Sequence, residues 1–177
     1  MTNDPLPKRQ SLRLKEYDYA QAGAYFITIC AQGRKCLFGD IADDQMCLND
    51  AGKMLAMLWS DIPNRFLFVE IDAFVVMPNH FHGIIVFPDT AGVGSDEMTK
   101  VPPLGDVIAA FKSIATVEYG HGVKTKSWPR FQQRLWQRNY YDHVIRNVKD
   151  LDRIRRYIDE NPARWAYDDE NPQKIVV

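Results

Sequence analysis

The chain has 177 residues, 46% of them hydrophobic and 12% aromatic, and its formal net charge is −1. This composition is that of an ordinary globular protein without internal repeats, so we expect one domain over residues 1–177, with an N-terminal extension at 1–20 and a C-terminal tail at 166–177. No window has the character of a signal peptide or a membrane span, which predicts a cytoplasmic protein without a membrane partner.

The predicted elements begin with a β-branched and aromatic strand at residues 24–31. A second short strand at residues 35–41 is a candidate partner for it, and residues 46–48 would extend that sheet. The cysteines in this region are odd in number and lack metal-ligand spacing, so we expect reduced thiols without a functional role. A helix follows, capped by Asn49 or Asp50 and stopped by Pro63 and Asn64.

The second half predicts two strands, at residues 68–76 and 80–87, joined by a Met-Pro-Asn turn. After a loop at residues 88–103 come a helix at 104–119, an extended segment at 135–145 and a helix at about 149–161. This βαββαβ order describes an α+β fold, with a ferredoxin-like antiparallel sheet, helices on one face and an extra C-terminal helix.

Two histidines, His80 and His82, open the apolar strand at residues 80–87. Because side chains alternate along a strand, both point to one face with Cα atoms roughly 6.5 to 7 Å apart, and Phe81 points to the other face. Two imidazoles at that spacing can share one metal ion. The alternative is that one or both are hydrogen-bonded core residues.

A basic and aromatic segment runs from residue 124 to residue 141 and contains no acid. Guanidinium groups suit phosphates and flat rings suit stacked bases, so this mixture predicts binding of a single nucleic-acid strand despite the net charge. The alternative is a solvated basic loop that Trp128 and Trp136 anchor to the core. The candidate DNA-binding residues are Lys112, Lys124, Lys126, Arg130, Arg134, Trp136, Arg138 and Tyr140.

The last predicted helix has a buried stripe of Leu151, Ile154 and Ile158, with Tyr157 one residue round from it. Asn161 lies at i+4 from Tyr157, hence on the same face one turn on. Alternatively, Tyr157 is a half-buried packing residue, and Asn161 is present because asparagine tolerates unusual backbone angles at a helix end.

Several blocks stand in the order in which a known family has them, at residues 13–19, 23–30, 76–82, 111–113, 136–147 and 156–162. With these blocks the chain resembles, over residues 11–172, the REP-associated tyrosine transposases, a branch of the single-tyrosine HUH endonucleases. The resemblance implies metal-dependent cleavage and rejoining of single-stranded DNA, through a 5′-phosphotyrosyl link, at the end of a mobile or REP-type element. It implies single-stranded or hairpin DNA as partner and leaves both a homodimer and a monomer open.

By the same resemblance, His80 and His82 match the family's two metal-binding histidines, Asn161 its polar third ligand and Tyr157 its nucleophile. Related insertion-sequence transposases often carry glutamine where Asn161 stands. Such a mixed nitrogen and oxygen set admits Mg²⁺ or Mn²⁺, with Mn²⁺ the better match to imidazole.

Other assignments stay open. Tyr140 and Tyr141 compete for the role of nucleophile, although only Tyr157 has helical spacing to Asn161. His143 is a proton carrier, a DNA contact or a residue with a structural hydrogen bond to a neighbouring strand. A second hypothesis is a DNA-binding relic without catalysis, and a third is a metallohydrolase that uses the histidine pair with Glu70 or Asp72. Covalent trapping of DNA separates these hypotheses.

Overall fold

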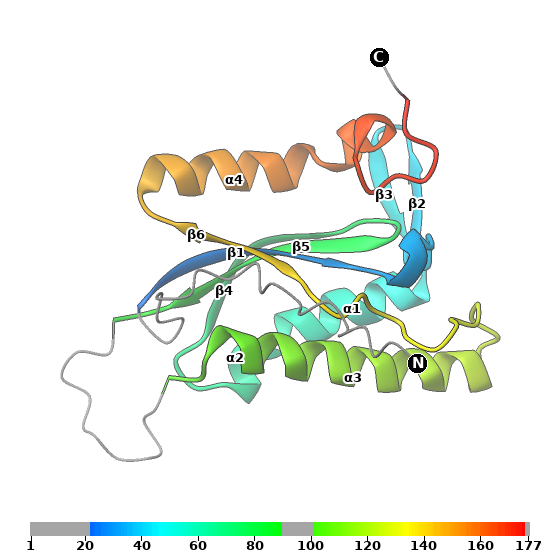
Figure 1. Ribbon diagram of the computed structural model, residues 1–177, viewed down its shortest axis with the longest axis horizontal. Helices are drawn as coiled ribbons and strands as arrows, with labels where there is room; N and C mark the ends of the chain where they lie inside the picture. Colours follow the sequence, from blue (N-terminus) through cyan, green and yellow to red (C-terminus); the bar gives the residue numbers. More distant parts are fainter. Residues whose placement is uncertain (1–21, 90–100, 176–177) are drawn as a thin grey trace, which may run out of the picture.

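The computed structural model describes residues 22–89 and 101–175, and its centre is a four-stranded antiparallel sheet (Figure 1). The strands are β1 (Gly23–Cys30), β4 (Glu70–Val76), β5 (His80–Phe87) and β6 (Tyr141–Ile145), in the order β4-β5-β1-β6. The predicted βαββαβ order and α+β class are confirmed. The N-terminal extension, most of the 88–103 loop and the last two residues lie outside the described residues.

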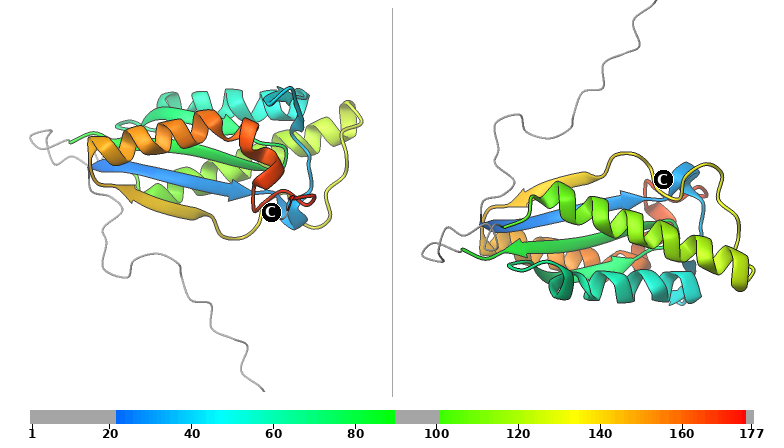
Figure 2. Two further views of the ribbon diagram at one scale, coloured as in Figure 1. Left: turned by 90° about the horizontal axis from the view of Figure 1, so that it is seen from above. Right: turned by 90° about the horizontal axis from the view of Figure 1, so that it is seen from below.

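Helices lie on both faces of this sheet, so it separates two cores (Figures 1 and 2). The larger core packs under α1 (Asp50–Ser60) and α3 (Leu104–Thr125), whereas α4 (Val148–Glu160) crosses the opposite face. On that face Ile154 and Ile158 of α4 pack with Phe26, Ile84 and Ile145 of the sheet. The extra helix therefore covers the face toward which the even-numbered residues of β5 point.

The helix after the first strands begins as predicted but ends differently. Asn49 is the N-cap of α1, because its side chain accepts a hydrogen bond from the backbone N–H of Gly52 at 2.9 Å. Pro63 does not stop this helix. α1 already ends at Ser60, and Pro63 lies in the first turn of the short helix α2 (Ile62–Arg65), where the missing N–H of a proline costs little.

The prediction that residues 35–41 pair with the first strand is wrong. β2 (Gly39–Ala42) and β3 (Gln45–Leu48) form a separate two-stranded sheet, reached from β1 through the short 3-10 turn η1 (Gln32–Arg34). β1 has no free edge, since β5 and β6 occupy its two sides. Gly39 adopts a φ of 142°, and a Cβ there would lie 2.2 Å from the carbonyl oxygen of Cys47, so only glycine fits this hairpin.

Two boundaries in the second half also differ from the prediction. α3 continues to Thr125, so Lys124 belongs to a helix rather than to an extended basic segment. Strand β6 begins only at Tyr141; before it, Trp136 makes one antiparallel bridge to Ala31. After α4 the chain continues into a 3-10 helix, η3 (Pro162–Tyr167), and a C-terminal segment at residues 168–175.

The three cysteines are free thiols, as predicted, and burial raises the pKa of Cys30 to about 12. In the described residues, no helix has both the length and the apolar character that crossing a membrane requires.

Candidate functional site

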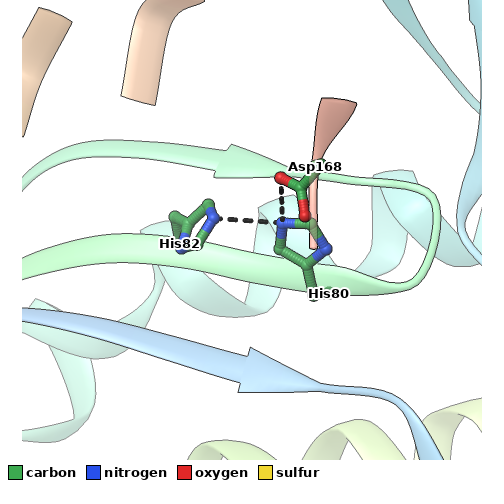
Figure 3. Close-up of side chains that lie close together, drawn as sticks. All are labelled: His80, His82 and Asp168. Carbon is green, nitrogen blue, oxygen red and sulfur yellow. Dashed lines mark hydrogen bonds and ion pairs between the residues drawn. The ribbon is translucent and has the colours of Figure 1, made fainter. Parts of the chain in front are cut away.

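Both histidines lie on the face of β5 that α4 covers, and both are buried, with exposed fractions of 0% for His80 and 4% for His82. Their Nε2 atoms are 3.0 Å apart (Figure 3). Phe81 points to the other face and packs on Trp59 of α1, with ring centroids 4.5 Å apart. The strand therefore places two imidazoles side by side, as its alternation predicts.

The ring orientation of His80 is set by Asn79. The Asn79 amide nitrogen donates to the carbonyl oxygens of Arg34 and Glu170, at 3.0 and 2.7 Å, so its Oδ1 is the atom that faces His80. That oxygen lies 2.9 Å from Nδ1 of His80 and can only accept a hydrogen bond. His80 consequently carries its proton on Nδ1 and presents the lone pair of Nε2 to His82.

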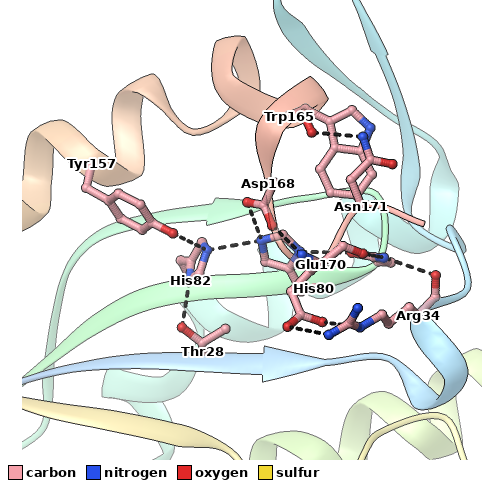
Figure 4. A network of polar contacts seen from close by, with 10 residues as sticks. Thr28, Arg34, His80, His82, Tyr157, Trp165, Asp168, Glu170 and Asn171 are labelled. Carbon is pink, nitrogen blue, oxygen red and sulfur yellow. Dashed lines mark hydrogen bonds and ion pairs between the residues drawn. The ribbon is translucent and has the colours of Figure 1, made fainter. Parts of the chain in front are cut away.

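His82 is oriented by a residue of the neighbouring strand β1. Nδ1 of His82 lies 2.8 Å from the hydroxyl of Thr28 (Figure 4). When Nδ1 carries the proton of His82, the lone pairs of both Nε2 atoms converge on one point. A hydrogen bond through the other ring nitrogen is the usual way in which proteins orient histidine ligands of a metal.

Burial keeps both rings neutral. It lowers the pKa of His80 to about 4, although the nearby carboxylate of Asp168 opposes this effect. Burial, followed by the neighbouring His80, holds the pKa of His82 well below its ordinary value. Both imidazoles are therefore available as ligands at neutral pH.

Tyr157 reaches the histidines from α4. Two hydrogen bonds, at 2.8 and 2.6 Å, form one bidentate pair between Arg155 of this helix and Asp72 of β4 and help to fix the helix on the sheet. The Tyr157 hydroxyl lies 3.4 Å from Nε2 of His82 (Figure 4). The Tyr157 ring packs edge-on against Phe26. Burial, and next the charge of Asp168, raise the pKa of Tyr157, so the hydroxyl is protonated at neutral pH.

Asn161 is 2% exposed, and its Oδ1 has no hydrogen-bond partner among the described residues. Its backbone has ordinary helical angles, φ −60° and ψ −42°, so an unusual backbone conformation does not explain the asparagine. Its amide is close enough to His80 and Tyr157 to affect the pKa of each. A buried oxygen beside two imidazoles is expected to have a partner, either a hydrogen-bond donor or a bound cation.

A carboxylate that the sequence did not single out completes the group. Oδ2 of Asp168 lies 3.9 Å from Nε2 of His80, and the potential ligand atoms of His80, His82 and Asp168 all lie within 4.8 Å of one another (Figure 3). In the sequence Asp168 is part of an acidic stretch close behind the helix of Tyr157, and that position was the one available signal. The predicted alternative carboxylate Asp72 pairs with Arg155, and neither it nor Glu70 belongs to this group.

His82, Tyr157, Asn161 and Asp168 line a cavity of about 820 Å³, and His80 lies behind His82, outside its lining. Its wall is built by β1, the segment before β6, the end of α4 and the C-terminal segment. The lining residues are Phe26, Thr28, Cys30, His82, Gln137, Asn139, Tyr140, Tyr141, Tyr157, Asn161, Arg164, Tyr167, Asp168, Asp169 and Glu170.

Some of the predicted DNA-binding residues are exposed, whereas others are buried or already hydrogen-bonded within the protein. Trp136 is 4% exposed and packs in the core, as the anchoring alternative expected, so its ring is not free for base stacking. Lys112 donates to the backbone carbonyls of Gln137 and Arg138, at 2.7 and 3.1 Å, and so holds the segment that leads to Tyr140 at the cavity. The exposed cations are Lys124, Lys126, Arg130, Arg134 and Arg138.

His143 has a structural partner. Its Nε2 lies 3.1 Å from the carboxylate of Asp150 in the first turn of α4, rather than on a neighbouring strand. Tyr141, the competing nucleophile, also lines the cavity and is 56% exposed.

Comparisons with known proteins give relatives along most of the chain. It is 39% identical over 180 residues to an "Uncharacterized protein" of Haemophilus influenzae, which covers 94% of each chain. It is 25% identical over 153 residues to a "Putative REP-associated tyrosine transposase" of the same organism, covering 85% of this chain and 76% of that protein. No protein-family model matches the chain.

Among solved structures, a REP-associated tyrosine transposase bound to a REP hairpin aligns with a TM-score of 0.59. The two chains are 23% identical, and the match covers 87% of this chain and 74% of that one. At this identity the likeness establishes a shared fold.

Proposed function

This chain is a relative of the REP-associated tyrosine transposases and shares their fold, and from that premise we propose that it is a metal-dependent endonuclease and strand transferase for single-stranded DNA. One observation carries the proposal. The hydroxyl of Tyr157 lies 3.4 Å from Nε2 of His82, beside two facing imidazoles and the unpartnered oxygen of Asn161, at a cavity of about 820 Å³.

The donor set fits a divalent metal. His80 and His82 supply nitrogen atoms, and Asn161 supplies an oxygen that is otherwise buried without a partner. This mixture suits Mn²⁺ and admits Mg²⁺. A bound cation would polarise the scissile phosphate and offset the negative charge that develops on it.

Tyr157 is the proposed nucleophile. Its phenolic oxygen forms a bond to the phosphorus while the bond from phosphorus to the 3′ oxygen breaks, so the DNA keeps a 5′ phosphate on the tyrosine and gains a free 3′-hydroxyl. The phenolic proton is released and the departing 3′ oxygen takes one up, which balances the step. Because the new link is also a phosphodiester, a second 3′-hydroxyl can reverse it without ATP.

The proposed substrate is single-stranded or hairpin DNA. The exposed cations that follow α3 suit phosphates, and Tyr140 at the cavity offers a ring on which a base can stack. The solved relative is described as bound to a REP hairpin, which supports the same class of DNA for this chain.

The test is covalent trapping with Tyr157→Phe and with Tyr141→Phe as the matched control, since both tyrosines line the cavity. Tyr157→Phe removes only a hydroxyl, so we expect DNA binding to persist while cleavage and the protein–DNA adduct disappear. Tyr141→Phe should retain cleavage and the adduct. The adduct is detected on a denaturing gel with a labelled strand and Mn²⁺, and mass spectrometry identifies the modified peptide. An adduct on Tyr140 or Tyr141 would contradict the assignment. No adduct with the wild-type protein would favour the DNA-binding relic.

A further inference from the structure

We propose that Asp168 is a further ligand of the metal held by His80 and His82, and that the metal thereby fastens the C-terminal segment, residues 168–175, to the sheet. This inference rests on the proposed function, because it assumes that the two imidazoles bind a cation. It adds a ligand from a segment beyond the helix of Tyr157.

The geometry of Asp168 is that of a ligand aimed at the histidines. Its side chain is 10% exposed, and Oδ1 accepts a hydrogen bond from the backbone N–H of Glu170 at 2.7 Å. This bond fixes the carboxylate and leaves Oδ2 directed at Nε2 of His80, 3.9 Å away (Figure 3). Each carboxylate oxygen thus has a separate role.

Asp168 differs from the other acids of the cavity in its ion-pair partners. Of the three acids that line the cavity, Glu170 pairs with Arg34 and Asp169 pairs with Lys174, whereas the only ion-pair partner of Asp168 in the described part of the chain is His80. Because the hydrogen bond to Asn79 places the proton of His80 on Nδ1, Nε2 offers Asp168 a lone pair and not an N–H group. A buried carboxylate without a balancing charge is unfavourable.

Other acceptor atoms face the same space between His80, His82 and Asp168. The Nε2 lone pair of His80 faces it, that of His82 can do so, and the unpartnered Oδ1 of Asn161 is buried beside them. The Tyr157 hydroxyl, 3.4 Å from Nε2 of His82, is a hydrogen-bond donor near this point, but its single proton cannot satisfy all of these acceptors. A divalent cation would satisfy them at once. The chemistry of the set, with nitrogen and oxygen atoms and one negative charge, is that of a Mn²⁺ or Mg²⁺ site.

Asn79 joins the histidine to the segment that carries Asp168. Its Oδ1 orients His80, and its Nδ2 donates to the carbonyl oxygen of Glu170 at 2.7 Å. Glu170 in turn pairs with Arg34 at 3.0 Å (Figure 4). The C-terminal segment is therefore seated against the same side chain that sets the ring of His80. A metal ligated by Asp168 would complete this attachment.

The experiment measures Mn²⁺ binding to the full chain without DNA, by isothermal titration calorimetry. Asp168→Asn is compared with Asp169→Asn, which removes the same charge from the next residue, an exposed one that also lines the cavity. Asparagine keeps the oxygen that accepts from Glu170, so the segment should stay folded, and the melting temperature of each metal-free variant checks this. His80→Ala with His82→Ala gives the baseline.

We expect Asp168→Asn to weaken Mn²⁺ binding by at least about tenfold, and Asp169→Asn to weaken it by no more than about twofold, because the charge of an exposed residue is screened. As a second readout, Mn²⁺ should slow tryptic cleavage after Arg164 in the wild type and in Asp169→Asn, but not in Asp168→Asn.

Equal Mn²⁺ affinity of Asp168→Asn and the wild type would overturn the inference, and so would equal losses in the two variants, which would indicate a general effect of charge. If Asp168→Asn bound Mn²⁺ normally and DNA more tightly, Asp168 would be a competitor of the phosphate instead. The proposed function fails separately, when the wild type binds no Mn²⁺ or when the double histidine variant binds it equally well.

Discussion

At the scale of single residues, Asn79 is buried and hydrogen-bonded through both ends of its amide. Its side chain is 1% exposed, and its amide makes three hydrogen bonds, to His80, to the carbonyl of Arg34 and to the carbonyl of Glu170. The two carbonyls fix which end of the amide is the acceptor. The asparagine in the turn before the histidines therefore sets the protonation of the first imidazole.

Replacing Asn79 with alanine should affect both metal affinity and stability. It leaves a buried N–H and two carbonyls without their partner, which we expect to lower the free energy of unfolding by about 1–3 kcal/mol. Loss of the group that orients a histidine ligand typically costs about 10–100-fold in metal affinity. Calorimetric titration with Mn²⁺ and urea unfolding measure the two effects. Asn64→Ala is the control, since that exposed amide donates to Asp61 and to no other residue within 22–89 and 101–175. An equal loss of affinity there would contradict the role of Asn79.

The sequence could predict those site residues that follow a local period. Alternation along a strand places His80 and His82 on one face, and helical spacing places Asn161 one turn beyond Tyr157. Asp168 follows no such period. Its position depends on the seating of residues 168–175 against Asn79 and Arg34, which are distant in sequence, so no local pattern could reveal it.

At the scale of elements, α3 continues past two glycines, beyond the predicted end of the helix at residue 119. Gly120 and Gly122 suggest an end near residue 119, but Trp128 packs over Gly122, whose carbonyl accepts from the N–H groups of Lys126 and Trp128. A Cβ at Gly122 would lie 2.1 Å from the Trp128 ring, whereas a Cβ at Gly120 would meet nothing within 4 Å. Packing of a side chain six residues further along the chain thus outweighs the low helix propensity of glycine.

The two glycines should respond oppositely to substitution by alanine. Gly120→Ala should raise the free energy of unfolding by about 0.5–1 kcal/mol, because alanine favours the helix and adds no clash. Gly122→Ala should lower it by about 1–3 kcal/mol, because it displaces the tryptophan ring. Urea denaturation of the two variants checks the difference, and shifts of the same sign would mean that Trp128 does not pack there.

The seating of α4 depends in part on the pair of Asp72 and Arg155. Hydrogen bonds from Arg155 hold the pKa of Asp72 below its usual value of 3.8. A carboxylate whose pKa is lowered in the folded state stabilises the fold above its unfolded pKa and contributes less as the pH falls through the folded value. Asp72→Asn should therefore cost about 0.5–1 kcal/mol at pH 7.

This difference between Asp72→Asn and the wild type should shrink as the pH falls below about 4, measured by urea unfolding across pH. Asp152→Asn is the matched control, because Asp152 also pairs with Arg155 but is more exposed, 56% against 24%. A pH-independent difference for Asp72→Asn would show that its charge is not what stabilises α4.

The wrong prediction that residues 35–41 pair with the first strand has a different cause from the wrong end predicted for α3. Residues 35–41 have the composition of a strand, but composition does not determine which strand of the sheet has an edge available for pairing. Strand β6, about a hundred residues later, occupies the second edge of β1 and forces the chain after η1 into its own hairpin. Such competition between distant segments could not be predicted from the local sequence.

At the scale of the whole molecule, the net charge of −1 conceals an uneven distribution. The acids of the C-terminal segment line the cavity, while exposed arginines follow α3 on the segment that leads to it. Binding of a charged strand should therefore depend strongly on salt, because phosphate contacts release counterions.

Replacing Arg130, Arg134 and Arg138 together with glutamine should weaken binding to all single-stranded sequences similarly. The slope of the logarithm of affinity against the logarithm of salt concentration should become shallower by about 2, since each lost phosphate contact on a single strand removes about 0.7. Fluorescence anisotropy at several salt concentrations measures this slope. The control replaces Lys53 and Arg65 on α1 and α2, and an equal change in slope there would contradict the assigned surface.

The sheet that separates the two cores has a consequence for hydrogen exchange. β5 is paired on both sides and almost wholly buried, so its amides should exchange chiefly through global unfolding, whereas α4 rests on a smaller cluster. A local opening of α4 would carry Tyr157 away from the histidines and leave the sheet intact. The free energy of that opening, read from the exchange rates of the α4 amides, therefore sets the fraction of time that the hydroxyl spends apart from the two imidazoles.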